Sequence, residues 1–458
     1  MRIICGYTVN LDSVTTINGA RVAGMIADHG LTERVLERVS SPRDGIYDVE
    51  DFFSGLLLSM KRGIGAEWLI FDRGVFDFLK EHFLDGSKVI LGGNSGNMAN
   101  VLSDLGAGEV VINAPCHSRV QAELFGRAVR IPRIVDGRFV LAHPTEADFD
   151  GVDEVGIHFV FNFTRGTRVK VGETDFVALN DDRFIATYDP ANIALAVNPV
   201  FEEYCERFAD RFDGAILSGF HLLLTEYPDG TTYRDKIDRL LDDLRSWKDK
   251  NPHLFVHLEL GYFHSGMVES YLLERLGDVD SLGMNEVELA RSSLLEGNHR
   301  LRSRIEDLDI EGVLEGASII LSLTDLSRVC VHTGEFVVSI FEKDFIDPGV
   351  EAEALEFGVR AAASYAETGR HLGRDRIEQV LEGFSPSRPG RTEVLRLLDL
   401  FSGCELKGGS SSGEVDGYYA AGVPVLRCET PVTSVGLGDT FTAATFLREL
   451  ELTKNKSL

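Results

Sequence analysis

The chain has few of the features that mark secreted, zinc-binding or membrane proteins. Its six cysteines are scattered and form no Cys-x-x-Cys pair, so neither a disulfide framework nor a zinc site is expected. No apolar run approaches the ~20 residues that a membrane-spanning helix needs. The N-terminus opens on the strand-like run Ile3-Ile4-Cys5 with no signal-peptide pattern. We therefore expect a cytoplasmic protein with reduced thiols.

Positive charge is also scarce. The sequence has 46 Lys and Arg against 73 Asp and Glu, a formal net charge of −27 at pH 7. Such an acidic field repels phosphate backbones, which argues against non-specific binding to nucleic acid. A phosphate-bearing ligand would therefore need local basic side chains or helix N-termini to hold it. The content of 44% hydrophobic and 26% charged residues is otherwise that of an ordinary globular protein.

The order of apolar runs predicts an α/β fold. Short β-branched runs at 110–112, 215–217 and 254–258 alternate with helical stretches at 96–105, 232–250 and 351–369. The run Ser318-Ile319-Ile320-Leu321 predicts a further strand, and the Gly- and Ser-rich residues 408–413 predict a mobile loop. At 458 residues the chain exceeds the size of one hydrophobic core, so a large domain and a smaller one are expected.

One segment departs from this pattern. Between residues 156 and 188 apolar and polar residues alternate in places, as in Arg168-Val169-Lys170-Val171, which predicts an antiparallel sheet with one solvated face. An antiparallel piece inside a parallel α/β chain is a candidate lid. The expected core is discontinuous, with residues 1–12, 89–155 and 189–458, and the expected lid comprises residues 13–88 and 156–188.

The most informative motif lies near the C-terminus, where Gly436-Leu437-Gly438-Asp439 joins a strand to a helix of small residues. Two glycines permit a tight turn, and backbone N–H groups at the start of a helix bind anions. A carboxylate fixed on that turn can accept a proton from a hydroxyl as the hydroxyl attacks phosphorus. The alternative is that Asp439 only caps the helix.

Two polar clusters suit a sugar. Asn10 and Asp12 alternate along a strand, so both side chains share a face from which they can hold neighbouring hydroxyls. Gly92 and Gly93 let a ligand approach the backbone closely, and Asn94 offers both a donor and an acceptor. An ordinary turn is the alternative for each cluster.

Two glutamates lie where ligands of open α/β sheets gather. Glu259 ends the run His257-Leu258-Glu259, and Glu288 ends Asn285-Glu286-Val287-Glu288. Mg²⁺ takes few carboxylates and keeps several waters, so this pair suits a hydrated ion that bridges phosphates. The residues alone leave a simpler alternative, in which Glu288 is solvated and Glu259 pairs with an arginine.

In order and spacing, these motifs resemble the ADP-dependent glucokinase/phosphofructokinase family of the ribokinase-like superfamily. The resemblance covers nearly the whole chain and rests on Gly6-Tyr7-Thr8-Val9-Asn10-Leu11-Asp12, Gly92-Gly93-Asn94-Ser95-Gly96, His257-Leu258-Glu259, Asn285-Glu286-Val287-Glu288 and Val435-Gly436-Leu437-Gly438-Asp439. It implies a three-layer α/β/α core with a smaller lid that contains an antiparallel sheet. It also implies a glycolytic kinase that transfers the β-phosphoryl group of ADP to a sugar hydroxyl, releases AMP and uses Mg²⁺.

The resemblance further implies a role for each residue. Asp439 would be the general base, and Glu259 and Glu288 would hold the metal. The sugar would contact Asn10, Asp12, Glu67, Gly93, Asn94 and His158. The nucleotide and its phosphates would contact Arg183, Asn285, His332, Thr333, Gly436 and Gly438. For Arg183, a local salt bridge to Asp181 or Asp182 is the simpler explanation.

The acceptor stays open at this point. Glu67 and His158 resemble the sugar contacts of glucokinases and favour glucose, whereas Arg165, Arg168 and Lys170 form a basic strip that would suit fructose 6-phosphate. One alternative is a kinase of the same fold that acts on a pentose phosphate such as ribose 1-phosphate, or on a nucleoside. A remote alternative is a non-catalytic sugar or nucleotide sensor, which the intact set of carboxylates argues against.

Overall fold

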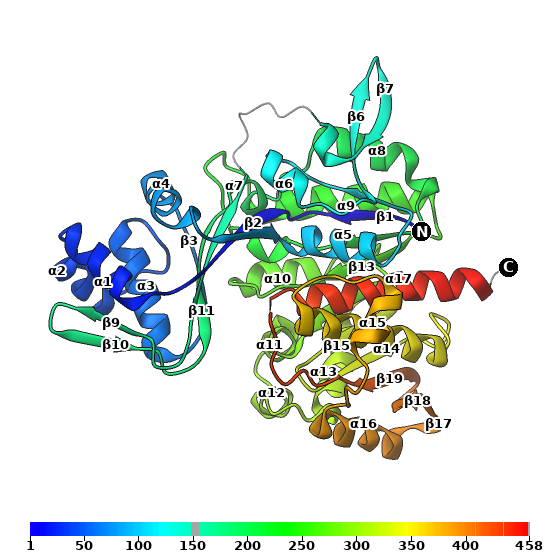
Figure 1. Cartoon of the computed structure of the whole chain (residues 1–458). Coiled ribbons are helices and arrows are strands. Elements are labelled where there is room, and N and C mark those ends of the chain that lie inside the picture. Colours follow the sequence, from blue (N-terminus) through cyan, green and yellow to red (C-terminus); the bar gives the residue numbers. More distant parts are fainter. Residues whose placement is uncertain (117, 148–154, 408, 434, 457–458) are drawn as a thin grey trace.

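The computed structural model describes residues 1–116, 118–147, 155–407, 409–433 and 435–456. Residues 148–154 of the expected core, Gly408 of the expected loop and Ser434 lie outside the described residues. The structure has a large part, here called the core, and a smaller part beside it, here called the lid (Figure 1). Within the described ranges, no helix is long and apolar enough to cross a membrane.

The core is built on a 12-stranded sheet. In spatial order its strands are β17 (Ser402–Lys407), β18 (Ser410–Val415), β19 (Tyr418–Pro424), β16 (Phe336–Phe341), β15 (Arg328–His332), β14 (Ser281–Asn285), β13 (Phe255–Glu259), β12 (Gly214–Leu217), β1 (Arg2–Gly6), β5 (Glu109–Ile112), β6 (Val129–Val135) and β7 (Arg138–Ala142). The strands from β15 to β6 pair in parallel, and antiparallel strands extend the sheet at both ends.

Helices cover both faces of this sheet, because successive strand residues point to opposite sides. Ile3 and Cys5 of β1 pack in the cluster of one face, whereas Ile4 packs in that of the other. The first face carries α5 (Asn94–Asp104), α14 (Pro348–Thr368), α15 (Arg374–Val380) and α17 (Leu437–Lys456). The second carries α8 (Pro199–Phe208), α9 (Tyr233–Lys250), α10 (Gly266–Leu273), α11 (Glu286–Arg291), α12 (His299–Glu306), α13 (Ile310–Leu323) and α16 (Arg388–Leu400). The expected three-layer α/β/α fold is confirmed.

Short elements join these layers. They are α6 (Arg119–Glu123), α7 (Pro190–Ile193), η2 (Pro144–Glu146), η3 (Ala209–Arg211), η4 (Phe220–Leu222) and η5 (Ser293–Leu295).

Two sequence predictions for the core are wrong. Residues 318–321 lie in α13 rather than in a strand, because a short apolar run fits either structure. A longer stretch of sequence shows the helical pattern, since Val313, Ala317, Ile320 and Leu321 fall at helical spacing and are buried against the sheet. Residues 410–413 are not a loop but part of β18, which pairs with a strand on each side and buries its serines.

The lid has a five-stranded sheet in the order β3 (Ala66–Leu69), β11 (Asp182–Tyr188), β8 (Ile157–Phe163), β2 (Asn10–Thr16) and β4 (Lys88–Gly92). Its pairing is mixed: β8 with β11 and β2 with β4 are antiparallel, and the other two pairs are parallel. The segment 156–188 supplies the predicted antiparallel pairs, including the ribbon of β9 (Arg168–Val171) and β10 (Thr174–Val177). The lid helices are α1 (Gly19–Asp28), α2 (Thr32–Ser40), α3 (Val49–Arg62), α4 (Arg73–Leu79) and the π-helical turn η1 (Lys80–Leu84).

The sheets shift the expected division of the chain by a few residues. Residues 10–12 and 89–92 belong to β2 and β4, and therefore to the lid sheet. Among the described residues, the chain crosses between core and lid at 7–9, at Gly93 and at Asp189. We propose these crossings as the domain boundaries.

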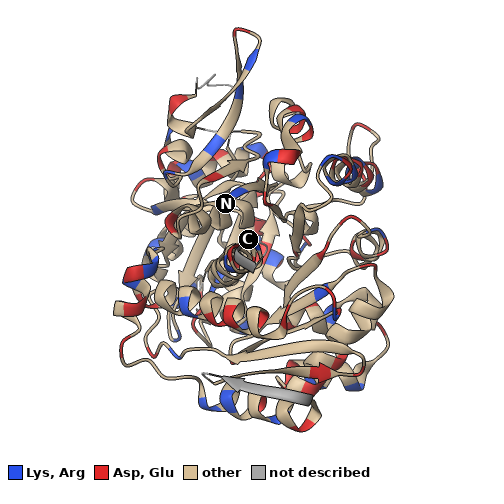
Figure 2. Ribbon diagram, turned by 90° about the vertical axis from the view of Figure 1, so that its right-hand side faces the viewer, with Lys and Arg blue, Asp and Glu red and all other residues tan. Residues whose placement is uncertain are grey.

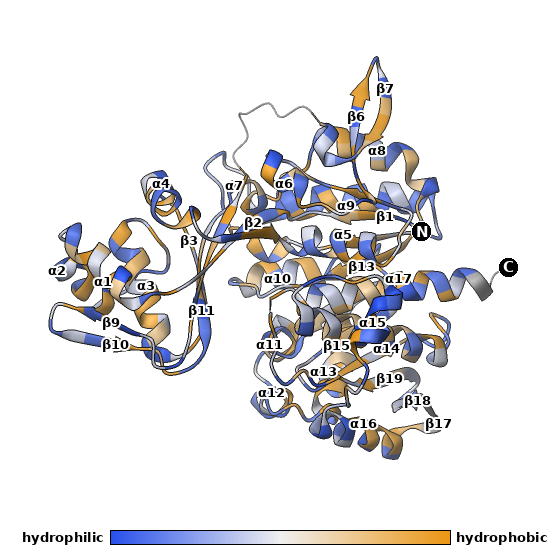
Figure 3. Ribbon diagram, in the orientation of Figure 1, coloured by the Kyte–Doolittle hydropathy of each residue, from blue (hydrophilic) through white to orange (hydrophobic). Residues whose placement is uncertain are grey.

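The two faces of the lid sheet differ in polarity. Leu11, Phe159 and Phe184 lie on one face and pack in a cluster with the lid helices. The alternate residues Asp12 and His158 are register partners on the opposite face. Figure 3 shows the corresponding mixture of apolar and polar positions along these strands. The strand period therefore places the polar set together on the face away from the helices.

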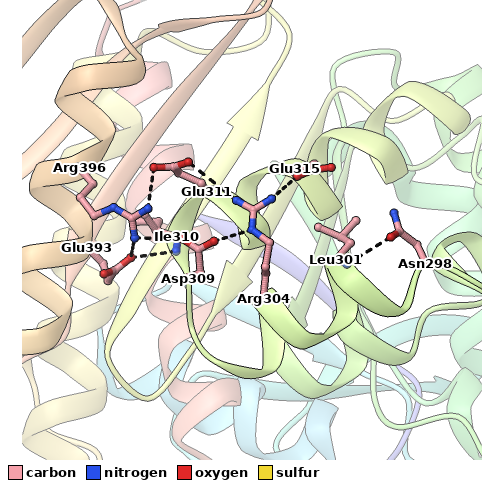
Figure 4. Close-up of polar contacts among 9 residues, drawn as sticks. All are labelled: Asn298, Leu301, Arg304, Asp309, Ile310, Glu311, Glu315, Glu393 and Arg396. Carbon is pink, nitrogen blue, oxygen red and sulfur yellow. Dashed lines mark hydrogen bonds and ion pairs between the residues drawn. The ribbon is translucent and has the colours of Figure 1, made fainter.

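Charges on the surface are interleaved. Figure 2 shows acidic residues spread over the helices with basic residues among them, so the acid excess is not gathered in one tract. One arginine network ties α12, α13 and α16 together (Figure 4). Arg304 contacts Asp309 at 2.6 Å and Glu315 at 2.5 Å, and Arg396 contacts Asp309 at 3.0 Å and Glu311 at 2.6 Å. Asp309 is thus shared by two guanidinium groups from different helices.

Candidate active site

The glycine turn near the C-terminus leads directly into α17, and Asp439 lies in the first turn of that helix. Gly436 has a φ of 77°, a conformation that favours glycine. Two amides of α5 hold the carboxylate: Asn94 Nδ2 donates to Oδ1 and Asn97 Nδ2 donates to Oδ2, each at 3.0 Å. Burial raises the pKa of Asp439 to about 7, against the hydrogen bond from Asn97. The carboxyl can therefore both take and release a proton near neutral pH.

A cavity of about 160 Å³ lies between lid and core on one side of this turn, and we call it the lid-side cavity. All six residues that the sequence predicted for the sugar line it, together with Arg183 and Asp439. Its lining is Thr8, Asn10, Asp12, Glu67, Gly93, Asn94, Asn97, His158, Val160, Arg183, Ile185, His221, Leu222, Val435 and Asp439. Polar groups from four lid strands thus converge on the predicted base.

A second cavity, of about 450 Å³, lies in the core on the other side of the turn. Leu437, Gly438 and Phe441 line it, as do the predicted nucleotide residues His332 and Thr333. We call it the core cavity. A Cβ at Gly438 would lie 2.9 Å from His332 Cε1, so this approach requires glycine. The residues at 435–439 therefore separate two cavities, and the N-terminus of α17 lies between them.

The lid wall of the lid-side cavity is a row of polar side chains around His158. His158 Nε2 lies 3.1 Å from Asp189 Oδ2, and Nδ1 lies 4.0 Å from Asp12 and 3.9 Å from Glu67. Glu67 Oε1 accepts from Thr187 Oγ1 at 2.6 Å. Burial lowers the pKa of His158, but the hydrogen bond to Asp189 and the surrounding carboxylates outweigh it and raise the pKa to about 9. The imidazole is therefore charged at neutral pH.

The floor of the cavity needs both glycines of the Gly92-Gly93 pair. A Cβ at Gly92 would lie 2.2 Å from Asp12 Oδ1, and one at Gly93 would lie 2.5 Å from the Thr8 carbonyl oxygen. Asn10 Nδ2 donates to Asp12 Oδ1 at 2.7 Å, so the strand presents the two side chains together as predicted. The pair is therefore part of a packed wall and not a free turn.

Glu259 is almost fully buried and accepts three hydrogen bonds. His332 Nε2 lies 2.9 Å from Oε1, and Thr442 Oγ1 lies 3.0 Å and His257 Nε2 3.3 Å from Oε2. Burial raises the pKa of Glu259, but the hydrogen bonds from the two histidines outweigh it and lower the pKa to about 2. Glu259 is thus a fixed anion paired with histidines, not with an arginine.

Glu288 behaves differently. Burial raises its pKa to about 7, with a further rise from the charge of Glu259. Asn285 caps α11 and donates from Nδ2 to Glu288 Oε1 at 2.8 Å, so it orients this carboxylate, and it lines neither the lid-side nor the core cavity. The described residues contain no group of three or more His, Cys, Asp or Glu that could hold a metal ion. Two carboxylates suit a hydrated Mg²⁺, which keeps several of its waters.

The predicted cations fall into two groups. Arg183 lines the lid-side cavity, and no ion pair of its guanidinium is found within the described ranges, so the expected salt bridge to Asp181 or Asp182 is absent there. Arg168 and Lys170 lie on the exposed face of β9 and pair with acidic neighbours. Neither they nor Arg165 line the lid-side cavity.

The sequence interpretation missed several site residues. Asn97 holds Asp439 from one helical turn after Asn94, and its spacing of three residues was the available signal. His221 lines the lid-side cavity from η4, and burial lowers its pKa to about 4, so it is neutral. Asp189 and Thr187 act on His158 and Glu67 across strands. No local pattern marks such contacts.

A sequence profile described as the ADP-specific phosphofructokinase/glucokinase conserved region matches residues 1–448. The chain belongs to this family. An ADP-dependent glucose/glucosamine kinase from Pyrococcus abyssi is 29% identical over 456 residues, 98% of this chain and 94% of that protein. An ADP-specific phosphofructokinase from Thermococcus zilligii is also 29% identical, over 464 residues, 100% of this chain and 97% of that protein.

A solved structure supports the same assignment. The structure of an ADP-dependent kinase in complex with fructose-6-phosphate and ADPβS superposes with a TM-score of 0.79. It is 25% identical, and the match covers 98% of this chain and 93% of that one. This member of the ADP-specific phosphofructokinase/glucokinase family is thus equally similar in sequence to a relative named as a glucose/glucosamine kinase and to one named as a phosphofructokinase.

Proposed function

We propose that this family member is an ADP-dependent sugar kinase that transfers the β-phosphoryl group of ADP to a sugar hydroxyl and releases AMP. The proposal rests mainly on the position of Asp439, which two amides hold at the N-terminus of α17 between two cavities. Sugar in the lid-side cavity and adenosine in the core cavity would bring hydroxyl and phosphate together at this turn. The names of the relatives support the same donor and acceptor classes.

The transfer follows from the positions of three groups. Asp439 takes the proton of the sugar hydroxyl as the hydroxyl oxygen bonds to the β-phosphorus. The bond from that phosphorus to the bridging oxygen breaks, and AMP leaves with the bridging oxygen. The N–H groups at the start of α17 and the unpaired guanidinium of Arg183 stabilise the charge on the transferred group.

Glu259 and Glu288 would hold Mg²⁺ through their carboxylates, and the ion would neutralise phosphate charge. His257, His332 and Thr442 keep Glu259 ionised and fixed for this purpose. Cytoplasm remains the proposed location, because Cys5, Cys205, Cys330 and Cys428 are free thiols, as in a reducing compartment.

Glucose is the acceptor that the lid-side cavity supports best. Asp12, Glu67 and Asp189 surround the cation His158 on the lid wall, which favours neutral hydroxyls over a second phosphate. Fructose 6-phosphate is the second candidate, because the phosphofructokinase relative is as similar as the glucokinase relative, and Arg183 offers an unpaired cation.

A matrix of donors and acceptors tests this proposal. ADP and ATP are each combined with glucose, fructose 6-phosphate, ribose 1-phosphate and nucleosides in the presence of Mg²⁺, and AMP release is measured. We expect turnover with ADP and glucose. Turnover with ATP alone, or only with a nucleoside, would overturn the proposed donor or acceptor. Turnover only with a sugar phosphate would show that Arg183 dominates the acceptor site.

A further inference from the structure

A polar row crosses the core sheet beside the active site. His257, Ser281 and Arg328 are register partners on the adjacent strands β13, β14 and β15. They share one face of the sheet, because partners in register point the same way. Glu259 lies two residues after His257 on the same face, at the end nearer Asp439. The row therefore connects the buried interior of the sheet with a predicted metal ligand.

Arg328 is the anchor of this row and is only 2% exposed. Its Nε lies 2.9 Å from Glu351 of α14, and its Nη2 lies 2.7 Å from Glu449 of α17. The same Nε also donates to Ser339 Oγ at 3.1 Å, and Nη1 donates to Ser281 Oγ at 3.1 Å. Two helices and three strands thus fix the orientation of one guanidinium group.

The direction of the hydrogen bonds follows from the chemistry of arginine. Arg328 can only donate, so Ser281 Oγ must accept from it. The single hydroxyl hydrogen of Ser281 is then available for His257 Nδ1, 2.9 Å away. A histidine that accepts at Nδ1 carries its proton on Nε2 when neutral, and Nε2 faces Glu259 Oε2 at 3.3 Å. In each hydrogen bond from Arg328 through Ser281 and His257 to Glu259, the donor is therefore the residue nearer Arg328 and the acceptor is the residue nearer Glu259.

A glycine on β14 leaves space for the side chains of His257 and Glu259 at this end of the row. A Cβ at Gly283 would lie 2.0 Å from Glu259 Oε2 and 2.8 Å from His257 Nε2. Any other residue there would displace the pair. The absence of a side chain on β14 is thus part of how the carboxylate is placed.

Stability alone does not account for the row. A buried arginine between two buried glutamates costs desolvation, and apolar residues of similar volume often give an equally stable core. The row also ends on Glu259, the predicted metal ligand. A buried polar network with all its bonds in one direction favours a single geometry over alternatives.

We propose that Arg328 is a positioning residue, which acts through Ser281 to hold His257 in the Nε2–H tautomer and so orients Glu259 for the divalent cation. The role in metal binding rests on the proposed kinase function. The tautomer of His257 does not, and it can be measured without substrate or metal.

The first experiment uses the wild-type protein. Long-range ¹H–¹⁵N correlation spectra of ¹⁵N-histidine-labelled protein, with His257 assigned from a His257→Gln sample, report which ring nitrogen carries the proton. We expect Nε2–H at His257 in the absence of ligands. An Nδ1–H tautomer would overturn the inference, whatever the enzyme assay shows.

The second experiment compares two matched serine variants. Ser281→Ala removes the link to His257, whereas Ser339→Ala removes another acceptor of the same guanidinium without touching His257. We expect mixed tautomers in the Ser281 variant alone, and a rise of about tenfold in the Mg²⁺ concentration for half-maximal turnover, the lower end of the range for groups behind a metal ligand. Ser281→Thr should restore both. Equal behaviour of the two alanine variants would assign the row to stability only.

Discussion

Replacing the predicted base gives the most direct test of the site. Asp439→Asn keeps the shape of the side chain but cannot take a proton. Both partners of the carboxylate, Asn94 and Asn97, donate through their Nδ2 groups. One of them must face the new amide NH₂ group, so about one hydrogen bond is lost, a cost of ~1 kcal/mol. The rest of the site is unchanged.

The variant should be inactive yet stable. Turnover should fall by about 100- to 10,000-fold, the usual contribution of a general base, while KM for sugar and ADP stays near the wild-type value. The pKa of Asp439 is raised from 3.8 to about 7, so its ionised form opposes folding. That cost is absent below pH 3.8, grows as the pH rises to about 7 and is complete above it.

The shift in the pKa of Asp439 gives the expected size of the effect on stability. Three pKa units correspond to at most about 4 kcal/mol, and the lost hydrogen bond reduces the gain to at most about 3 kcal/mol at pH 8. At pH 4 the wild-type carboxyl is protonated and also presents a donor to one of the two amides, so the two proteins should be about equally stable. AMP release measures turnover, and urea denaturation of both proteins at pH 4, 6 and 8 measures stability. Turnover within about tenfold of wild type would refute the assignment. A stability difference independent of pH would refute the buried, ionised carboxylate.

Three further predictions follow from other parts of the molecule. Arg304→Ala breaks the network of Figure 4 and should cost about 1 kcal/mol in low salt and less in high salt, whereas Arg302→Ala, which loses one exposed pair, should cost under about 0.5 kcal/mol by urea denaturation. Glu67→Ala should raise KM for glucose far more than KM for fructose 6-phosphate, and an equal rise would remove Glu67 from the choice of acceptor. Sugar should slow hydrogen exchange in residues 156–188, and identical exchange profiles would mean a lid that does not close.

Local chemistry explains why much of the site was predictable. The turn at Asp439 and the alternation of Asn10 and Asp12 each depend on a few consecutive residues. Their conformations follow from glycine freedom and strand period. The α/β architecture was predictable from local sequence as well, because the alternating apolar runs indicate which segments are buried.

Contacts between distant strands were not predictable in this way. Thr187 reaches Glu67, and Asp189 fixes the charge of His158, only because β3, β11 and β8 become neighbours in the folded lid. The mixture of parallel and antiparallel pairs in that sheet likewise depends on how the chain crosses between strands, which the hydropathy pattern of the sequence does not reveal. The helix at 318–321 was misjudged because a run of only four residues, three of them apolar, fits the period of a strand and that of a helix equally well.

The places where the chain crosses between core and lid have a mechanical consequence. Thr8 lies in the first crossing and lines the lid-side cavity, Gly93 forms the second and lines it too, and Asp189 forms the third and holds His158. Among the described residues, a rotation of the lid would turn about these three crossings. These crossing residues thus also belong to the proposed sugar site, so a substitution that stiffens one of them should change sugar affinity and turnover together.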